Sequence, residues 1–334
     1  MKKQTVAPVE SGKARPKLAR LKGKAGAALR LVPKEFVRDW QLYLLLLIPV
    51  VYLLIFNYGP MYGVQIAFRD YRLTGGVTGS EWVGLKHFEK FLNNYLFGRV
   101  FKNTLTIALY NIAVGFPLPI ILALLLNTVK NEKFKRFTQT ISYIPHFLSV
   151  TIMVSIITMV FNPITGLYGA IYRLTGGTGY PYDFVSMPEA FPHVYVWSDV
   201  WQQLGWNTII YMAALSGVSK DHHEAAMIDG ASRWKRIIHV DLPAILPTIC
   251  TMLILRCGSI ISVGFEKAYL LQTNLNLDAS EVIATYVYKN GMSGIKSFSY
   301  GTAVGLFNSV INCTLLVLVN WIVKKISNNE SSLF

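Results

Sequence analysis

The chain contains 334 residues, of which 52% are hydrophobic and 15% are charged. Soluble domains contain about 25% charged residues, so this composition excludes an ordinary soluble domain and indicates a membrane protein. The net charge of +14 would suggest nucleic-acid binding in a soluble chain. Here the basic residues are grouped in a way that membrane topology explains, and no nucleic-acid partner is predicted.

The N-terminal segment, residues 1–39, carries eleven Lys and Arg residues among Ala, Gly and Pro. This composition predicts a disordered, basic cytoplasmic tail that lies along anionic membrane lipid. A secretory signal is disfavoured, because the basic region is too long and no small-residue cleavage site follows the first apolar run.

Six apolar segments long enough to cross a membrane follow the tail. They lie at about residues 40–58, 103–126, 139–161, 193–218, 242–265 and 300–323. Pro117 and Pro119 predict a kink in the second of them. The segments 59–101, 162–192 and 266–299 are predicted to be external, the first with Gly-rich turns at residues 75–76 and 79. Residues 326–334 form a predicted cytoplasmic C-terminal tail after the transmembrane domain, residues 40–325.

The distribution of basic residues tests this topology. The predicted internal segments hold 21 Lys and Arg residues, and the predicted external segments hold 9. Because cytoplasmic loops carry an excess of Lys and Arg, both termini are predicted to be cytoplasmic. The chain is thus expected to be a multi-pass protein of the bacterial cell (inner) membrane.

A short charged segment, residues 219–241, separates the fourth and fifth apolar segments. Asp221 is placed to cap a helix and to form a capping box with Glu224. Gly230 is placed to end that helix in a left-handed conformation, and Ser232 can cap a second short helix. Pro243 suits the first turn of the next long helix. The segment therefore predicts two short helices with a Gly joint between membrane spans.

This segment resembles the EAA motif of ABC-importer permease subunits. The residues that carry the resemblance, or that accompany it in the same loop, are Glu224, Ala225, Ala226, Asp229, Gly230, Trp234, Ile237, Val240, Leu242, Pro243 and Pro247. The family usually has Phe where this chain has Ile237, and Trp234 offers aromatic bulk nearby. Residues 201–207, 264–266, 285–288 and 332–334 are similar to the sugar-type permeases, in particular the lipo-oligosaccharide and polysaccharide branch.

The resemblance implies an all-α polytopic membrane protein with six transmembrane helices and a type I ABC-importer permease-like fold. It implies alternating access, with the loop docked on an ATPase subunit. The implied partners are a homologous second permease subunit, two ATPase subunits, an extracellular or periplasmic sugar-binding protein and an oligosaccharide. The chain lacks a G-x-x-x-x-G-K-[ST] run, so ATP and Mg are expected in the partner ATPase subunits and no cofactor in this chain.

Polar and aromatic residues in the fourth span suggest a substrate path. The candidates are Asp199, Trp201, Gln202, Trp206 and Asn207. Ionisable groups at membrane depth usually face a cavity or a partner, and aromatic rings beside amides suit a carbohydrate. An interfacial aromatic belt explains Trp201 equally well. Arg256, within the fifth span, is predicted to be structural and paired with a carboxylate or with helix carbonyls.

Two other classes of function remain open at this point. A secondary transporter of a small polar solute would show inverted repeats, and no convincing repeat is present. A membrane-embedded enzyme would need a catalytic set of residues, and the sequence offers no nucleophile–base pair near Glu224. The pair His222–His223 does not match the His-Glu-x-x-His zinc pattern, and the three Cys residues lie in apolar segments, so no metal site is predicted.

Overall fold

The computed structural model describes residues 38–291 and 297–326. These residues form helices joined by turns, together with one two-stranded hairpin. The chain divides into two compact units, Met1–Gly63 and Val64–Phe334, which are described separately. The predicted basic tail lies outside the described residues except at its end, and so does almost all of the predicted C-terminal tail.

The described part of the first unit is one apolar helical run. It comprises α3 (Trp40–Leu53), the π-helical turn η1 (Leu54–Tyr58) and α4 (Gly59–Met61). None of these residues is buried. Apolar side chains exposed all round suit contact with lipid. The helical path continues through η2 (Tyr62–Phe68), so the first predicted span is confirmed as helix but extends ten residues further.

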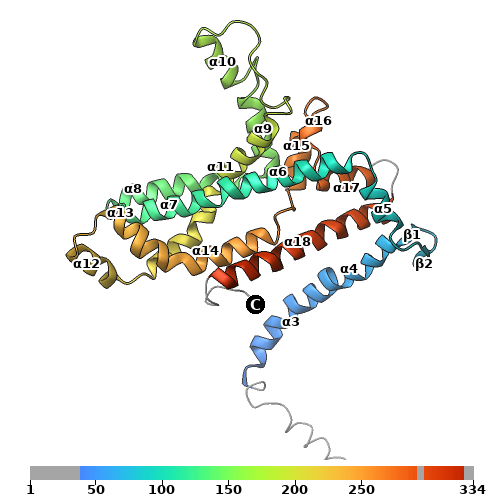
Figure 1. The fold of residues 1–334 in the computed structure, drawn as a ribbon, viewed down its shortest axis with the longest axis horizontal. Helices are drawn as coiled ribbons and strands as arrows, with labels where there is room; N and C mark the ends of the chain where they lie inside the picture. Colours follow the sequence, from blue (N-terminus) through green and yellow to red (C-terminus); the bar gives the residue numbers. More distant parts are fainter. Residues whose placement is uncertain (1–37, 292–296, 327–334) are drawn as a thin grey trace, which may run out of the picture. The chain divides into compact units, whose positions relative to one another are not determined.

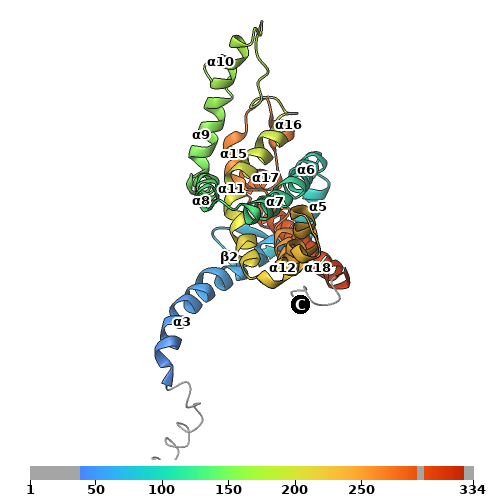
Figure 2. The ribbon, with the colours of Figure 1, turned by 90° about the vertical axis from the view of Figure 1, so that its left-hand side faces the viewer.

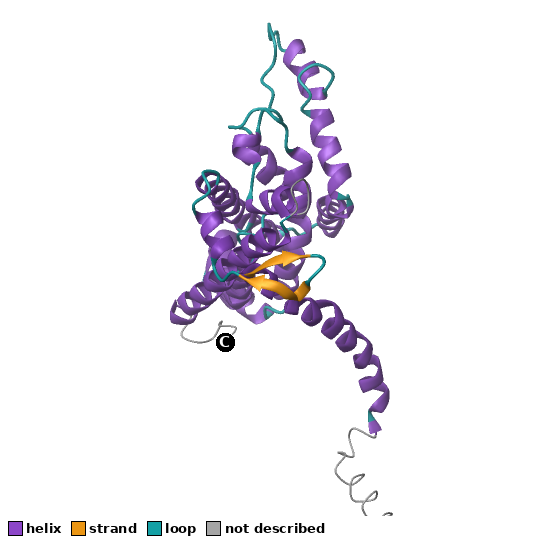
Figure 3. Ribbon diagram, turned by 90° about the vertical axis from the view of Figure 1, so that its right-hand side faces the viewer, coloured by secondary structure: helices purple, strands orange, loops and turns teal. Residues whose placement is uncertain are grey.

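The second unit begins with a hairpin that the all-α prediction missed. The strands β1 (Arg69–Arg72) and β2 (Gly76–Trp82) pair antiparallel, as Figure 3 shows in orange. Gly76 has φ +62° in the turn, where the sequence predicted a Gly-rich turn. The backbone N–H of Tyr71 donates to Ser299 Oγ at 2.9 Å, and this bond attaches the hairpin to helix α18. The strands are too short to give a clear alternating pattern in the sequence.

The helix of the second span is interrupted at Phe116, directly before the predicted kink site at Pro117. After α5 (Lys86–Leu92), the span is divided into α6 (Phe97–Gly115) and α7 (Pro117–Thr128). Pro117 begins the second helix because it cannot donate the backbone hydrogen bond that would continue the first.

The third predicted span, residues 139–161, is sharply bent rather than one continuous helix. The segment contains α8 (Glu132–Tyr143), the 3₁₀ turn η3 (Ile144–Phe147) and α9 (Val150–Val160), and its two halves meet at 103°. Pro145 lies in the turn, Leu148 is extended, and Ser149 Oγ caps α9 by accepting from Ile152 N at 3.3 Å. Figure 2 shows α9 leaving the direction of α8 at this point.

The remaining helices follow in chain order. They are α10 (Leu167–Leu174), α11 (Phe191–Ser216), α12 (Lys220–Ile228), α13 (Arg233–Arg236), the π-helical turn η4 (Ile237–Asp241), α14 (Leu242–Cys257), α15 (Phe265–Leu271), α16 (Leu277–Ser280), α17 (Ile283–Gly291) and α18 (Phe298–Ile326). The fifth predicted span, 242–265, is helical only to Cys257. The third predicted external segment, 266–299, consists largely of short helices.

By length and composition, four helical segments in the described residues can cross a membrane, and the bent α8–α9 pair is a possible fifth. They are Trp40–Phe68, Phe97–Thr128, Arg233–Cys257 and Phe298–Lys325. Helix α11 has 26 residues, but its polar side chains lower its mean hydropathy and leave it outside this group. The structure is therefore mostly helical with four or five candidate spans, and six spans stay a prediction.

Helix α11 is the centre of the second unit. It packs against α6, α7, α8 and α14, while α14 also packs beside α18, as Figure 1 shows. One apolar core joins α6, α9 and α11, and another joins α7, α11 and α14. Gly205 lets α11 approach α8 closely: a Cβ at this position would lie 2.2 Å from the Ser142 carbonyl oxygen.

Candidate coupling loop and substrate path

The loop that resembles the EAA motif begins at a serine cap. Ser219 Oγ accepts from Asp221 N at 3.2 Å, so Ser219 caps α12, and the predicted capping box of Asp221 with Glu224 does not form. Both residues can cap a helix, and Ser219 lies two residues closer to the preceding span. Glu224 and Ala225 are exposed on α12, and no residue of this helix is buried.

Gly230 ends α12 as predicted. Its φ is +73°, a left-handed conformation that is easy only for glycine. Its N–H donates to the Met227 carbonyl at 3.1 Å, and Ala231 N donates to the Ala226 carbonyl at 2.8 Å. These two bonds form a Schellman motif, which satisfies the last carbonyls of the helix and reverses the chain direction.

The second half of the loop is anchored in the core. Ser232 caps α13 as predicted, since its Oγ accepts from Lys235 N. Ile237 is 8% exposed and packs in the core of α7, α11 and α14, where the family usually places Phe. Trp234 is 66% exposed, so it does not fill that core position. Leu242 and Pro243 begin α14, so the loop continues directly into a long apolar helix.

Four large apolar side chains of the loop are exposed: Met227, Ile228, Trp234 and Ile238. Met227, Ile228 and Trp234 are 51%, 87% and 66% exposed. Asp229 and Glu224 are exposed beside them. A group of apolar side chains edged by charges is typical of a surface that binds another protein.

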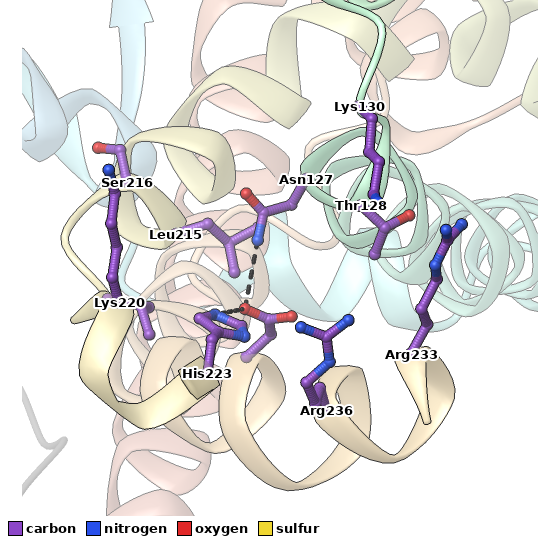
Figure 4. A pocket seen from close by; sticks show the side chains of 11 residues that line it. Asn127, Thr128, Lys130, Leu215, Ser216, Lys220, His223, Arg233 and Arg236 are labelled. Carbon is purple, nitrogen blue, oxygen red and sulfur yellow. Dashed lines mark hydrogen bonds and ion pairs between the residues drawn. The ribbon is translucent and has the colours of Figure 1, made fainter. Parts of the chain in front are cut away.

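A buried polar network ties α12 to two other helices. Asp241 is 2% exposed. Its Oδ1 accepts from Asn127 Nδ2 at 3.2 Å and lies 3.2 Å from His223 Nε2. Figure 4 shows these residues in a cavity of about 400 Å³ beside the loop. The network joins the end of α7, the coupling loop and the start of α14.

Two further cavities adjoin one another along α11. One, of about 200 Å³, lies between α6, α11 and α14, and Asp199 is in its wall. The other, of about 380 Å³, includes Trp206 and Asn207 in its wall. Arg256 and Ser259 line both cavities. The fourth predicted span thus contributes polar and aromatic groups to two cavities that share part of their walls.

The first of these cavities contains a charged network. Arg256 Nη2 donates to Asn111 Oδ1 at 2.6 Å, and Asn111 Nδ2 donates to Asp199 Oδ2 at 2.8 Å. Arg256 lies 3.9 Å from Asp199, as predicted for a cation paired with a carboxylate. On the other side of Asp199, the Lys267 Nζ is 3.6 Å from Oδ1 and lies over the Tyr195 ring. Two cations therefore surround one anion.

The other predicted path residues lie in different surroundings. Trp201 lines a separate, apolar cavity together with Trp197. Gln202 is 5% exposed and donates its Nε2 to the Leu148 carbonyl at 3.0 Å, so it fixes the bend between α8 and α9. Trp206 stacks on the ring of His146, with centroids 4.2 Å apart and an angle of 4°.

Sequence reasoning missed several residues of this site. Asn111 and Lys267 belong to the network around Asp199, and His146 supports Trp206. Gln203 Oε1 accepts a hydrogen bond from His146 Nδ1 at 2.9 Å, which further fixes that ring. Polar residues within otherwise apolar segments were the available signal for Asn111 and His146.

Comparisons with known proteins agree with this arrangement. Residues 115–328 match the family described as binding-protein-dependent transport system inner membrane component. The chain is 44% identical over 288 residues to the protein LplB of Bacillus subtilis (strain 168), covering 86% of this chain and 90% of that protein. It is 41% identical to the polygalacturonan/rhamnogalacturonan transport system permease protein YteP of the same organism, covering 87% and 90%.

A solved structure is also similar. A chain of a bacterial alginate ABC transporter, in complex with a periplasmic protein that holds an alginate pentasaccharide, superimposes with a TM-score of 0.80. The two chains are 34% identical, and the match covers 90% of this chain and 99% of that one. The resemblance drawn from the loop residues is thereby confirmed. The chain belongs to the family of binding-protein-dependent transport system inner membrane components, as a permease subunit of an ABC transporter.

Proposed function

We propose that this chain forms part of the pathway by which an acidic oligosaccharide enters a bacterial cell, driven by ATP hydrolysis in partner subunits. The observation that carries the proposal is the pair of cavities along α11, one of which is lined by Trp206, Asn207 and Arg256. A ring stacks on the C–H face of a sugar, an amide binds hydroxyls, and a guanidinium pairs with a carboxylate. Family membership favours this importer over a secondary transporter.

The names of similar proteins support an acidic substrate. One similar structure is of a transporter for import of the acidic polysaccharide alginate, and YteP is named for polygalacturonan and rhamnogalacturonan. In this chain, Arg256 and Asp199 line the adjoining cavity, and the buried Lys267 lies behind Asp199 at 3.6 Å, so the network beside the cavity holds two cations and one carboxylate. An excess of positive charge in a low-dielectric cavity attracts an anionic ligand.

The proposed topology has six spans and cytoplasmic termini. Helix α11 supplies the crossing that hydropathy alone omits: its 26 residues rise about 39 Å, more than a hydrocarbon core of about 30 Å. The bent α8–α9 pair supplies another. The internal excess of Lys and Arg supports a cytoplasmic position for the loop of residues 219–241 in this topology.

The proposed coupling runs through the loop into α14. The exposed face of Met227, Ile228 and Trp234 docks in a cleft of an ATPase subunit, with Glu224 and Asp229 at its edge. Movement of that subunit then shifts α12 and α13. Ile237 and the hydrogen-bonded Asp241 transmit the shift to the helices that line the cavities. The proposed complex contains a second, homologous permease, two ATPase subunits and a sugar-binding protein outside.

The substrate path is tested by Trp206→Ala and Asn207→Ala. Each change removes one contact of about 1 kcal/mol, so each should raise the apparent transport constant for an acidic oligosaccharide about five-fold. Trp197→Ala is the matched control, because Trp197 lies on the same helix with similar exposure but lines the separate apolar cavity. Uptake is measured in proteoliposomes that contain the whole complex with its binding protein.

If Trp206 and Asn207 only pack against neighbouring helices, the outcome differs. Complex yield or melting temperature would then fall, while the concentration dependence of transport would match that of the Trp197→Ala control. That result would remove the α11 cavity from the path.

A further inference from the structure

The cavity beside the coupling loop is strongly cationic. It is lined by Lys130 after α7, Lys220 at the start of α12, and Arg233 and Arg236 of α13. Its one carboxylate, Asp241, already accepts from Asn127 and pairs with His223. In Figure 4, basic side chains from these separate elements border the same space. Such an excess of cations is costly unless an anion occupies the space between them.

The basic side chains of this cavity are not neutralised by close carboxylates in the described part of the chain. Within residues 38–291 and 297–326, none of the four makes an ion pair with a carboxylate. The Nε atom of Arg236 is buried and has no hydrogen-bond partner among the described residues. A buried N–H without an acceptor is rare and costly, and a guanidinium offers several donors in a plane. Arg236 also lines the cavity, so the other N–H donors of its guanidinium border the same space as the three remaining cations.

We propose that this cavity binds a phosphate group, in the first instance the headgroup of an anionic phospholipid. Guanidinium and ammonium donors that converge from several directions match the oxygens of a phosphate. The cavity lies where the apolar helices α7 and α14 end and begin. Basic pockets between such helix ends on the cytoplasmic side suit lipid headgroups. This inference rests on the cytoplasmic placement of the loop proposed above.

A bound phosphate would act on the coupling loop. Lys130 follows the second span, whereas Lys220 and Arg236 belong to the loop. One phosphate held by all three would fix the loop against that span, next to the Asp241 network. Free inorganic phosphate offers the same oxygens, so it is a second source of the ligand that the experiment must distinguish from lipid.

The experiment measures lipid retention by the intact complex of this permease with its partner subunits. The complex is incubated in detergent with phosphatidylglycerol or with phosphatidylcholine, and retained lipid is counted by native mass spectrometry. Lys130→Gln and Arg236→Gln should each lower retained phosphatidylglycerol about five-fold, the loss of one phosphate contact. Lys133→Gln is the control, because Lys133 is an exposed basic residue nearby that does not line the cavity. Phosphatidylcholine retention should be equal in all four proteins.

Inorganic phosphate distinguishes the two sources. Excess inorganic phosphate is added to each protein. If it lowers phosphatidylglycerol retention by the wild type but not by the two variants, the site accepts phosphate from either source. If it displaces none while the two variants lose lipid, the site is specific for the headgroup. Equal phosphatidylglycerol retention by wild type and variants would overturn the proposal. If the variants then retained the ATPase subunit more weakly, the four cations would instead pair with carboxylates of that subunit. Normal transport alongside that result would leave the proposed function intact.

Discussion

Gly230→Pro is expected to abolish transport and substrate-stimulated ATPase activity, while the protein still inserts in the membrane. The backbone φ of +73° at this position is incompatible with proline, whose ring holds φ near about −65°. Proline also removes the N–H that donates to the Met227 carbonyl at 3.1 Å. Without this reversal, α13 and the exposed Trp234 no longer face the same partner surface as α12.

Two further variants calibrate the effect of Gly230. Gly230→Ala should give a partial loss, because a left-handed alanine costs about 1–2 kcal/mol and its Cβ meets no neighbouring atom. Gly217→Ala should behave as the wild type, since Gly217 has φ −83° and its added Cβ makes only an ordinary contact. Transport and ATPase rates are compared at equal membrane levels. A wild-type rate in Gly230→Pro would contradict the role of this joint.

Gly205→Ala is expected to reduce the yield of assembled complex and to lower its melting temperature. The new Cβ would lie 2.2 Å from the Ser142 carbonyl oxygen, which is backbone and cannot rotate away. Helices α8 and α11 must then separate, and such overpacking costs about 1–3 kcal/mol. Gly98→Ala is the matched control, because a Cβ there meets nothing and alanine favours a helix. Equal melting temperatures in the two variants would show that α8 and α11 are not packed this closely.

The coupling loop could be predicted well from the sequence because its signals are local. A left-handed Gly230 and a capping Ser232 act through hydrogen bonds to residues within five positions. The choice between Ser219 and Asp221 as the first cap could not be made, because both side chains can accept the same kind of bond. The role of the loop in docking on an ATPase subunit was inferred from its resemblance to a known motif, because local hydrogen bonding does not indicate function.

The bend in the third span could not be predicted from hydropathy. Residues 139–161 contain no Asp, Glu, Lys or Arg, so the pattern is that of one continuous span. What stabilises the bend is distant in sequence: Gln202 of α11 donates to the Leu148 carbonyl, which the bend leaves free. The pairing of His223 with Asp241 is likewise a contact between separate elements that no spacing rule encodes.

The regular geometry of α11 explains why the substrate-path candidates line different cavities. At about 100° per residue, Trp206 lies about 20° from Asp199 around the helix axis, whereas Trp201 lies about 200° away. The structure accordingly places Asp199 and Trp206 in adjoining cavities and Trp201 in another. The different position of Trp201 could have been predicted from the sequence, because the calculation assumes only a regular helix over these residues.

Cross-linking tests most directly whether the exposed face of α12 docks on an ATPase subunit, as proposed above. Ala225→Cys is made in a protein whose Cys250, Cys257 and Cys313 have been replaced, and the intact complex is treated with a short bifunctional thiol reagent in membranes. The reagent's second end reacts with a cysteine introduced into the ATPase surface that faces the membrane, and a product that joins the two subunits is expected for position 225 and none for Thr178→Cys in the predicted external segment. The claim would be contradicted if an assembled, ATP-hydrolysing complex gave no product at 225, or gave one at 178 instead.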